Sequence, residues 1–408
     1  MQRRRKHGEI SSRNDLFCEI LRDEAVARLN ELGKVSDADG YLERTFMSPA
    51  SLRAGNLIRG WMEDAGLRTW VDQLGNLHGR VEGTNASAEA LLIGSHLDTV
   101  VDAGIFVGSL GIISALSALK VLNVNGTVGK LRQPNEVIAF SDEGGVRFHS
   151  TFLGSAAIAG VLPLTALQIS DKSGVTVQDA LKENSLEITE ENLLQLKYDP
   201  GSVWGYVEVH IEQGPVLEWL GFPLGVVRHS WPDKTKGYSE SSLVCTVGEI
   251  STWPSASNVI PGQVTFTVDL RAIDDMGRKA VIYELSNQMY KICERRSVSC
   301  IIDRKHDVNA VVCDSELSSQ LKSTTYSALR KMVGDIQDET PTLMSGVGHD
   351  AMAMSHLTKV GMLFVPCRGG VSDTDGYLER TFMRPASLRA GNLIRGWMED
   401  ASLRIWVD

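Results

Sequence analysis

Four polar side chains lie at the ends of short apolar runs, and their types are those of a hydrolytic site. His96 and Asp98 end the run ALLIGSHLD, Glu143 ends EVIAFSDE, and His210 ends GYVEVHIEQ. A neutral imidazole at His96 can bind a divalent metal while Asp98 holds its second nitrogen and fixes the tautomer. His210 can supply a second nitrogen ligand, and Glu143 can act as the general base that deprotonates a metal-bound water. Together the four residues indicate a metallohydrolase.

The alternative for each residue is an ordinary structural role. A strand-end histidine such as His96 or His210 is often only hydrogen-bonded, and Glu143 can be a solvated loop carboxylate. The same placement at the end of an apolar run recurs for all of them, which favours the catalytic interpretation.

The apolar runs are typical of strands, and the segments between them are typical of helices. Residues 109–122, SLGIISALSALKVL, carry leucine or isoleucine at positions 110, 113, 116 and 119, the spacing of a crossover helix. Two later runs, PTLMSGVGHD and KVGMLFVPCRGG, repeat the strand pattern. The alternation predicts an α/β fold over residues 85–215 and about 315–370. In such sheets ligands bind outside the carboxyl ends of the strands, where the chemical residues are expected to converge.

Residues from about 218 to 308 have a different pattern of predicted strands and helices. Two β-rich runs, SSLVCTVGEI and GQVTFTVDLRAI, precede a helix, and the run VSCIIDR predicts a further strand. The order β-β-α-β predicts a small α+β insertion. We therefore expect the catalytic domain at residues 1–217 and 309–370, the insertion at 218–308, and a separate last segment at 371–408.

The composition is that of a folded protein. The 408 residues are 43% hydrophobic and 23% charged, near globular averages. The net charge of −10 argues against a nucleic-acid or anionic-membrane partner. No stretch of about 18 apolar residues predicts a membrane span, and no apolar core of a signal peptide follows the basic N-terminal cluster, which predicts a cytoplasmic location. The six cysteines form no C-x-x-C pair and are expected to be reduced thiols.

One segment occurs twice in the chain. Residues 35–72 return as residues 371–408 with four differences. Two copies so far apart are not a repeat fold, which needs at least three stacked units. In the first copy Ser48 and Pro49 predict a helix start and Gly66 predicts its end, whereas the second copy has Arg384 and Ser402 at the cap and stop positions. We hypothesise that the second copy replaced the original C-terminal segment of the fold.

Several runs together resemble the plant allantoate deiminase family of dinuclear amidohydrolases, which is related to aminoacylases and carbamoyl amino-acid hydrolases. The similar runs cover most of residues 30–370 and include GSHLDTVVDAGIF, AFSDEGGVRFHSTFLGSAAIAG, VEVHIEQGPVLEW, SNVIPGQVTFTVDLRAIDD and SGVGHDAMAMSHL. The resemblance implies a mixed-sheet α/β catalytic domain with an inserted α+β lid that forms a homodimer. It further implies a manganese-dependent hydrolase, with two Mn²⁺ per subunit, that releases ammonia and carbon dioxide from allantoate. Plant members reside in the endoplasmic reticulum.

The resemblance also implies roles for single residues. His96 and His210 match ligands of the first metal, Asp98 matches the aspartate behind them, and Glu143 matches the general base. His349 matches a histidine that contacts the substrate and stabilises charge in the transition state. The substrate-binding residues implied are Arg271, Asn258 and Gln213, of which Arg271 and Asn258 match residues that grip the substrate carboxylate. Outside the resemblance, Arg271, Asn258 and His349 have structural alternatives as a strand-surface charge, a turn asparagine and a helix N-terminal histidine, respectively.

The chain departs from the family pattern at three metal ligands. Val107 stands where the family has the aspartate that bridges both metals, and Gly144 stands where it has a second glutamate. Asp373 stands where the family has the last histidine ligand, and it is the one substitute that can still bind manganese. A catalytic site needs about three protein ligands, so one weak metal site, or none, is expected. Between Val227 and Ser242 the family has a further lid strand and helix, so the lid is expected to be truncated.

These observations leave two classes of function open. The first is an amidohydrolase that acts on allantoate or on a related substrate such as ureidoglycolate or an N-carbamoyl amino acid. The second is a catalytically impaired or inactive product of a rearranged gene that keeps the fold. The ligand losses at positions 107, 144 and 373 favour the second class, and the retained residues favour the first.

Overall fold

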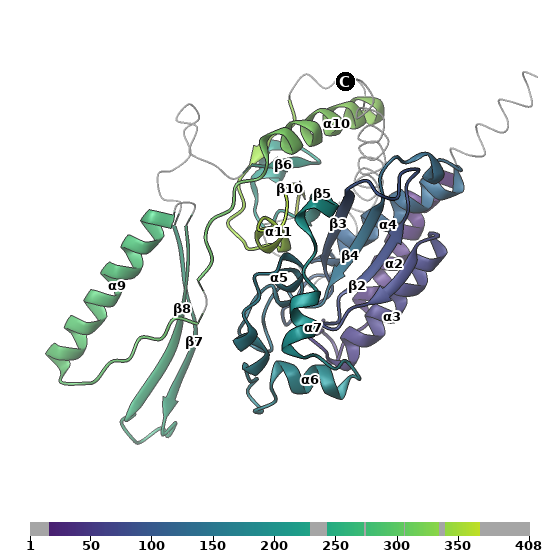
Figure 1. Ribbon diagram of the computed structural model, residues 1–408. Helices are drawn as coiled ribbons and strands as arrows, with labels where there is room; N and C mark the ends of the chain where they lie inside the picture. The colour runs from purple at the N-terminus through teal and green to yellow at the C-terminus, as the bar shows by residue number, and fades with distance from the viewer. Residues whose placement is uncertain (1–15, 229–242, 273–274, 306, 334–338, 368–408) are drawn as a thin grey trace, which may run out of the picture. The chain divides into compact units, whose positions relative to one another are not determined.

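The chain divides into two compact units, which are described separately. The computed structural model describes residues 16–228, 243–272, 275–305, 307–333 and 339–367 (Figure 1). Unit 1 comprises Met1–Arg228, Cys313–Leu343 and His349–Asp408, and unit 2 comprises His229–Val312 and Met344–Gly348. The second copy of the repeat, with Asp373, lies outside the described residues.

Unit 1 is built on an eight-stranded mixed sheet in the order β1-β2-β4-β3-β5-β10-β6-β9. The central strands β4, β3, β5 and β10 are parallel, whereas β2 and β6 run antiparallel to their central neighbours. The strands are β1 (Arg68–Val71), β2 (Leu77–Val81), β3 (Ala90–His96), β4 (Asn135–Phe140), β5 (Val203–Ile211), β6 (Gly225–Val227), β9 (Thr342–Leu343) and β10 (Val360–Val365). This architecture confirms the predicted α/β class with a mixed sheet.

Helices cover both faces of this sheet (Figure 1). Helix α4 packs on β3 and β5, and α3 packs on β1 and β2, while α11 packs on β5, β10 and α5. The helices of unit 1 are α2 (Ala25–Gly33), α3 (Pro49–Asp64), α4 (Ser109–Val124), α5 (Leu153–Ala159), α6 (Val177–Glu183), α7 (Glu190–Gln195), α8 (Val216–Leu220), α10 (Ser315–Val333) and α11 (Asp350–Met354). Short π or 3-10 turns are η1 (Glu19–Glu24), η2 (Val128–Lys130), η3 (Leu164–Gln168) and η4 (Pro200–Ser202).

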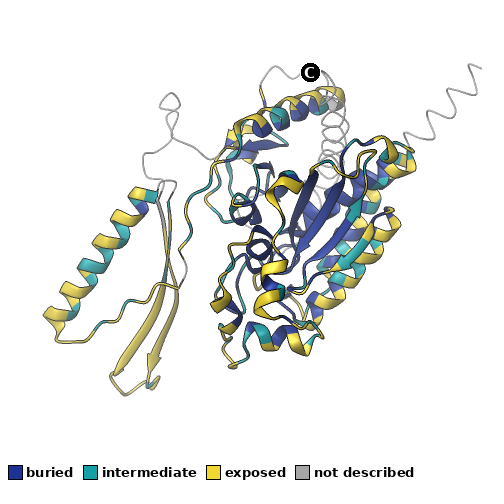
Figure 2. Ribbon diagram, viewed as in Figure 1, coloured by how far each residue is buried: buried dark blue, intermediate teal, exposed yellow. Residues whose placement is uncertain are grey.

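The core of unit 1 lies where β3 and β4 meet α4. Every residue of β3 and β4 is buried (Figure 2). Helix α4 contains the predicted helical run and is apolar and buried almost all round, because it packs against η1, α2 and α3 as well as against the sheet. Strand β6 hydrogen-bonds to β10. The chain therefore stays with this sheet up to Arg228, beyond the boundary expected at 217.

The first copy of the repeat forms α3 and the strand after it, with the predicted start and end. The Ser48 hydroxyl accepts a hydrogen bond from the Ser51 amide, and Pro49 is the first helical residue. After the helix, Gly66 has a φ of +84°, which an L side chain adopts only with strain. A Cβ at this position would also lie 2.5 Å from Asn123 Nδ2. The second copy, with Arg384 and Ser402, therefore lacks both features that the first copy uses.

Unit 2 consists of a hairpin and one helix among the described residues. Strands β7 (Leu243–Trp253) and β8 (Gln263–Ala272) pair antiparallel, and α9 (Asp275–Arg296) packs on β8. The prediction of a strand in the run VSCIIDR is wrong, because the chain is irregular over these residues and pairs with no strand among the described residues. Most side chains of β7 and β8 are exposed (Figure 2).

The prediction of reduced thiols is wrong for one pair in unit 2. Cys293 and Cys300 form a disulfide, with their Cα atoms 6.2 Å apart. The chain reverses after α9, where the Val298 amide donates to the Cys293 carbonyl at 3.0 Å, and this turn brings Cys300 back to the helix. The other four cysteines are free.

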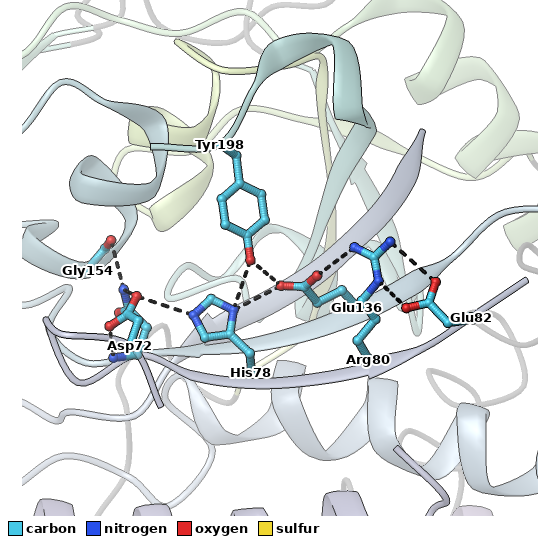
Figure 3. A network of polar contacts seen from close by, with 8 residues as sticks. Asp72, His78, Arg80, Glu82, Glu136, Gly154 and Tyr198 are labelled. Atoms are coloured by element: carbon cyan, nitrogen blue, oxygen red, sulfur yellow. Dashed lines mark hydrogen bonds and ion pairs between the residues drawn. The ribbon is translucent and has the colours of Figure 1, made fainter. Parts of the chain in front are cut away.

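A buried polar network ties β2 to β4 (Figure 3). His78 lies between two carboxylates, with Nε2 3.3 Å from Asp72 Oδ2 and Nδ1 2.9 Å from Glu136 Oε1. The Tyr198 hydroxyl donates to Glu136 Oε1 at 2.6 Å, and Arg80 pairs with the other oxygen of Glu136 at 3.2 Å. Burial by itself lowers the pKa of His78, but its bonds to Asp72 and Glu136 outweigh burial and raise the pKa to about 9. The ring is therefore an imidazolium that donates from both nitrogens at neutral pH.

Within the described ranges, no helix has the length and apolar character needed to cross a membrane.

The residues that distinguish the two copies give a stability prediction. We expect Ser48→Arg with Gly66→Ser to lower the free energy of unfolding by about 2–3 kcal/mol, from a lost helix cap and a strained left-handed serine. Thr69→Ile, also taken from the second copy, changes a partly exposed strand position and should cost less than about 0.5 kcal/mol. Urea unfolding of the variants measures both values. Equal stability of the double variant and the parent would contradict this account.

The His78 network gives a pH prediction. Because its folded pKa lies above the unfolded value of about 6.5, the stabilisation is complete below about pH 6.5 and is lost as the pH rises through 9. Removing one partner of a buried ion pair costs about 3 kcal/mol, so His78→Gln should be strongly destabilised at pH 6. The difference from the parent should shrink as the pH approaches 9. Asn135→Ala, a buried change without a titrating group, is the control whose cost should not vary with pH.

Candidate active site

The first site residues lie at the carboxyl end of β3. His96 is its last residue and is buried. Its Nδ1 donates to the backbone carbonyl of Asp98 at 2.8 Å and lies 3.3 Å from the Asp98 carboxylate. This fixes the tautomer and directs Nε2 away from the backbone. Burial opposes charge on the ring, but Asp98 and Glu143 outweigh it and raise the pKa of His96 to about 10, so a cation that binds Nε2 must displace its proton.

The sheet register brings His210 beside His96. In the parallel pair of β3 and β5, Gly94 is opposite Glu208, so the residues two positions later face each other. The two Nε2 atoms are 3.3 Å apart. His210 Nδ1 donates to the Ile211 carbonyl at 2.9 Å, so its Nε2 presents a lone pair. Burial and the nearby charge of His96 lower the pKa of His210 to about 3.

Glu143 reaches the histidine pair from the loop after β4. One oxygen of its carboxylate lies 3.9 Å from His96 Nε2. The loop is held by Asp98, whose two carboxylate oxygens accept hydrogen bonds from the Glu143 and Gly144 amides at 2.8 and 3.0 Å. The same aspartate therefore orients the first histidine and positions the loop of the predicted base.

His349 joins the cluster from a separate part of the chain. It precedes the first turn of α11 and is buried. Its ring centroid is 4.6 Å from that of His210, and Phe364 packs on its other side at 5.4 Å. The structure thus brings together His96, Asp98, Glu143, His210 and His349, which lie at four separate places in the sequence.

Three further buried carboxylates lie around this cluster: Asp142, which the sequence places at the end of a strand without a role, and Glu208 and Asp350, which sequence reasoning did not indicate. Glu208 accepts from the Ser95 hydroxyl and the Ala351 amide, and Asp350 accepts from the Ser155 hydroxyl at 2.6 Å. Burial raises the pKa of Glu208 to about 7 and raises the pKa values of Asp142 and Asp350. The sequence held a signal for Glu208: it lies two residues before His210 on the same strand, so the two side chains are on the same face of the sheet.

Arg44 is a second group that the sequence reasoning missed. Its side chain is completely buried and donates to the Leu97 and Leu32 carbonyls at 2.7 and 2.9 Å. The backbone of Arg44 also exchanges hydrogen bonds with Thr99. Arg44 thus holds both sides of Asp98. Burial lowers the pKa of the guanidinium to about 10, and the Asp98 charge opposes this shift.

The residues present fit one divalent cation better than two. Nitrogens bound to one tetrahedral ion at about 2.0–2.1 Å lie about 3.4 Å apart, close to the observed separation of the two Nε2 atoms. One buried oxygen of Asp142 and one of Asp350 have no hydrogen-bond partner among the described residues, and burial raises the pKa of both groups. No three histidine, cysteine or carboxylate side chains within the described ranges gather as a ligand set.

The positions of Val107 and Gly144 account for the missing ligands. Val107 is buried in the apolar core and precedes Gly108, where an added Cβ would collide with His96. An isopropyl group beside the site offers no electron pair to a cation. At Gly144 a Cβ would lie 3.2 Å from Asp98 Oδ2, close but with room for a small adjustment.

The three predicted substrate residues lie in different places. Gln213 follows β5 with a φ of +52°, and its buried Oε1 has no partner among the described residues. Arg271 lies on β8 in unit 2, half-exposed and paired with Asp269 at 2.7 Å. Asn258 lies in the exposed turn between β7 and β8. Arg271 is opposite Val244 and Gln263 is opposite Trp253, so Arg271 lies about 25 Å along the hairpin from the turn that carries Asn258.

Comparison with known proteins identifies relatives over nearly the whole chain. The family model for peptidase family M20/M25/M40 matches residues 92–391. Allantoate deiminase 2 of Glycine max is 66% identical over 420 aligned residues, covering 90% of this chain and 87% of the relative. Allantoate deiminase of Arabidopsis thaliana is 62% identical, covering 88% and 79%.

A solved structure of AtUAH in complex with (S)-hydroxyglycine has the same fold, with a TM-score of 0.82 and 22% identity over 93% of this chain and 97% of that one. A more distant relative, the N-carbamoyl-L-amino acid amidohydrolase of Geobacillus stearothermophilus, is 33% identical and covers 85% of this chain and 90% of its own length. The histidine pair, the nearby carboxylates and this similarity agree: the chain belongs to the M20/M25/M40 peptidase family, in its allantoate deiminase branch, and is a hydrolase of C–N bonds.

Proposed function

We propose that this chain hydrolyses allantoate, with His96, His210, Glu143 and His349 as its working residues. The observation that carries the proposal is the pair of Nε2 atoms 3.3 Å apart with the Glu143 carboxylate beside them. We take allantoate as the substrate from the names of two relatives, both allantoate deiminases, whose alignments with this chain cover 87% and 79% of their own lengths. The related N-carbamoyl amino-acid amidohydrolases make an N-carbamoyl amino acid the comparison substrate.

The chemistry is hydrolysis of a terminal ureido group. Glu143 takes a proton from the attacking water, whose oxygen bonds to the ureido carbon. The C–N bond to the terminal nitrogen then breaks, and Glu143 returns the proton to that nitrogen, which leaves as ammonia. The carbamate that remains loses carbon dioxide and gives ureidoglycine. His349 stabilises the oxyanion that develops on the carbonyl oxygen.

A divalent cation is part of this proposal. His96 and His210 would hold it, with Asp98 behind His96, and Mn²⁺ is the cation we propose. When bound, it supplies a Lewis acid that polarises the ureido carbonyl. Because two imidazoles are fewer than the three protein ligands of usual catalytic sites, we propose weak and exchangeable binding. A low rate then follows from partial occupancy.

We also propose that the substrate carboxylate is held by residues from two copies of the chain. Arg271 suits a carboxylate because its guanidinium forms two parallel hydrogen bonds. Arg271 and the Asn258 turn are about 25 Å apart along one hairpin, so one hairpin does not bring both to a single carboxylate. A homodimer can bring both side chains to one substrate carboxylate if one copy contributes Arg271 and the other contributes Asn258. The exposed apolar residues on the hairpin, including Ile250 and Trp253, are suited to such an interface.

The proposed function predicts metal-dependent ammonia release. In excess Mn²⁺, the purified parent should release ammonia from allantoate faster than from N-carbamoyl amino acids. Glu143→Gln should lower kcat by at least about 100-fold, because a base is lost while the fold is kept. His96→Ala should abolish the response to Mn²⁺.

The control for this assay restores the missing carboxylates. Val107→Asp with Gly144→Glu should raise the rate at limiting Mn²⁺ by at least about tenfold, since added ligands tighten binding. Ammonia release that is the same in the parent and the Glu143→Gln variant would overturn the assignment of the base. A parent rate unaffected by chelation of divalent cations would overturn the cation proposal.

The two-copy proposal predicts complementation between inactive variants. Arg271→Ala and Asn258→Ala should each raise the KM for allantoate strongly. Mixed dimers of the two variants contain one site with both residues intact, so random mixing should restore about a quarter of the parent activity. A matched mixture in which both chains carry Arg271→Ala restores nothing. Absence of any gain in the first mixture, with dimers present in sedimentation, would contradict the arrangement.

A further inference from the structure

The loop that carries Glu143 is anchored at two points. At its far end, the Glu143 and Gly144 amides donate to Asp98. At its near end, directly after β4, the Ser141 amide donates to Asn76 Oδ1 at 3.0 Å. The first anchor belongs to the site already described, whereas the second reaches the loop from the turn between β1 and β2.

Asn76 is completely buried and every polar atom of its side chain is used. Its Nδ2 donates to Asp72 Oδ2 at 2.8 Å and to the Gly154 carbonyl at 3.2 Å. Two acceptors on one side and a backbone N–H on the other leave a single possible orientation of the amide. An acid, a leucine or an alanine at this position would lose at least one of these three contacts.

Helix α5 leaves room for this contact. Gly154 lies against Asn76, and a Cβ at Gly154 would overlap Asn76 Oδ1 and lie 3.0 Å from the Ser141 amide. A methyl group at Gly154 would therefore displace the Asn76 side chain and disturb its contact with Ser141, while residue 76 stays an asparagine. Gly154→Ala is thus an independent test of the same contact.

The charged network behind Asn76 sets its position. Asp72 Oδ1 accepts from the Leu74 and Asn76 amides, and Asp72 Oδ2 faces both Asn76 and His78. His78 is in turn fixed by Glu136 on β4 (Figure 3), and the Trp70 ring stacks on the His78 ring with their centroids 4.8 Å apart. The path from Asp72 through Asn76 to Ser141 is thus a continuous series of hydrogen bonds between buried groups.

We propose that Asn76 is a positioning residue for Glu143: through the Ser141 amide it holds the start of the loop so that the Glu143 carboxylate stays beside the His96–His210 pair. The inference rests on the proposed function for the role of Glu143. Ser141 is two residues before Glu143, so a shift of the Ser141 backbone moves the carboxylate directly. Displacement of a catalytic group by about 1 Å can cost 100-fold in rate.

The test compares Asn76→Ala, Asn76→Asp and Gly154→Ala with the control Asn135→Ala. Asn135 is a buried asparagine at the start of β4, the strand whose other end leads into Ser141. Its side chain donates to the Gln133 carbonyl at 3.0 Å. Asn76→Asp keeps the shape and the acceptor for Ser141 but places an oxygen against Asp72 Oδ2 and the Gly154 carbonyl. All four variants lose buried polar contacts, but the control leaves the loop anchor intact.

Two readouts separate positioning from general stability. Hydrogen exchange should show protection of the 141–144 amides falling by about tenfold or more in the Asn76 and Gly154 variants, and unchanged in Asn135→Ala. Ammonia release should show kcat falling by about tenfold with KM within about twofold in the same variants, at thermal stabilities matched to the control. Equal kcat losses in Asn135→Ala, or unchanged 141–144 protection in Asn76→Ala, would overturn the proposal.

The two arms also separate this inference from the proposed function. A parent that releases no ammonia from allantoate, with the loss of protection still confined to the Asn76 and Gly154 variants, overturns the substrate assignment and supports the anchor. A parent that is active, with kcat unchanged in Asn76→Ala, supports the substrate assignment and overturns the positioning role.

Discussion

The carboxylate of Asp98 connects the end of β3 to the loop that follows β4, beside the backbone hydrogen bond that the Leu97 amide donates to the Phe140 carbonyl. It lies 3.3 Å from the ring nitrogen of His96 and accepts hydrogen bonds from the Glu143 and Gly144 amides. Arg44 holds the chain on both sides of it from a completely buried position. Because His96, Asp98 and Arg44 are buried, water does not replace a hydrogen-bond partner that one of them loses, and the loss leaves an unpaired polar group.

This constraint explains why so much charge lies inside unit 1. A buried carboxylate is costly unless a donor or a positive charge faces it. At the site, backbone amides and His96 face Asp98. Away from the site, the imidazolium of His78 serves Asp72 and Glu136 in the same way. The two charged clusters are linked through Asn76 and Ser141.

Val107 and Gly144 stand at two of the positions where we propose that metal-binding carboxylates have been lost, and both fit the surrounding structure. Valine at 107 joins the apolar core, and glycine at 144 still donates its amide to Asp98. The other site residues are thus arranged without these two carboxylates, whose absence we propose removes the capacity to hold a second cation. Restored carboxylates would enter a site whose other residues are already arranged, which is why we expect them to act on metal binding.

The sequence by itself determined the α/β class, the central strands, the crossover helix and the start and end of α3, because periodicity, caps and glycines act locally. It also indicated the strand-end residues His96, Glu143 and His210, since such endings are visible in one dimension. Their convergence was decided by the parallel register of β3 and β5, which places the two imidazoles 3.3 Å apart. The disulfide, the irregular run after α9 and the roles of Arg44 and Asn76 depend on contacts between distant segments. Such contacts leave no local pattern, because a buried arginine or asparagine is defined by the partners that the tertiary structure brings to it.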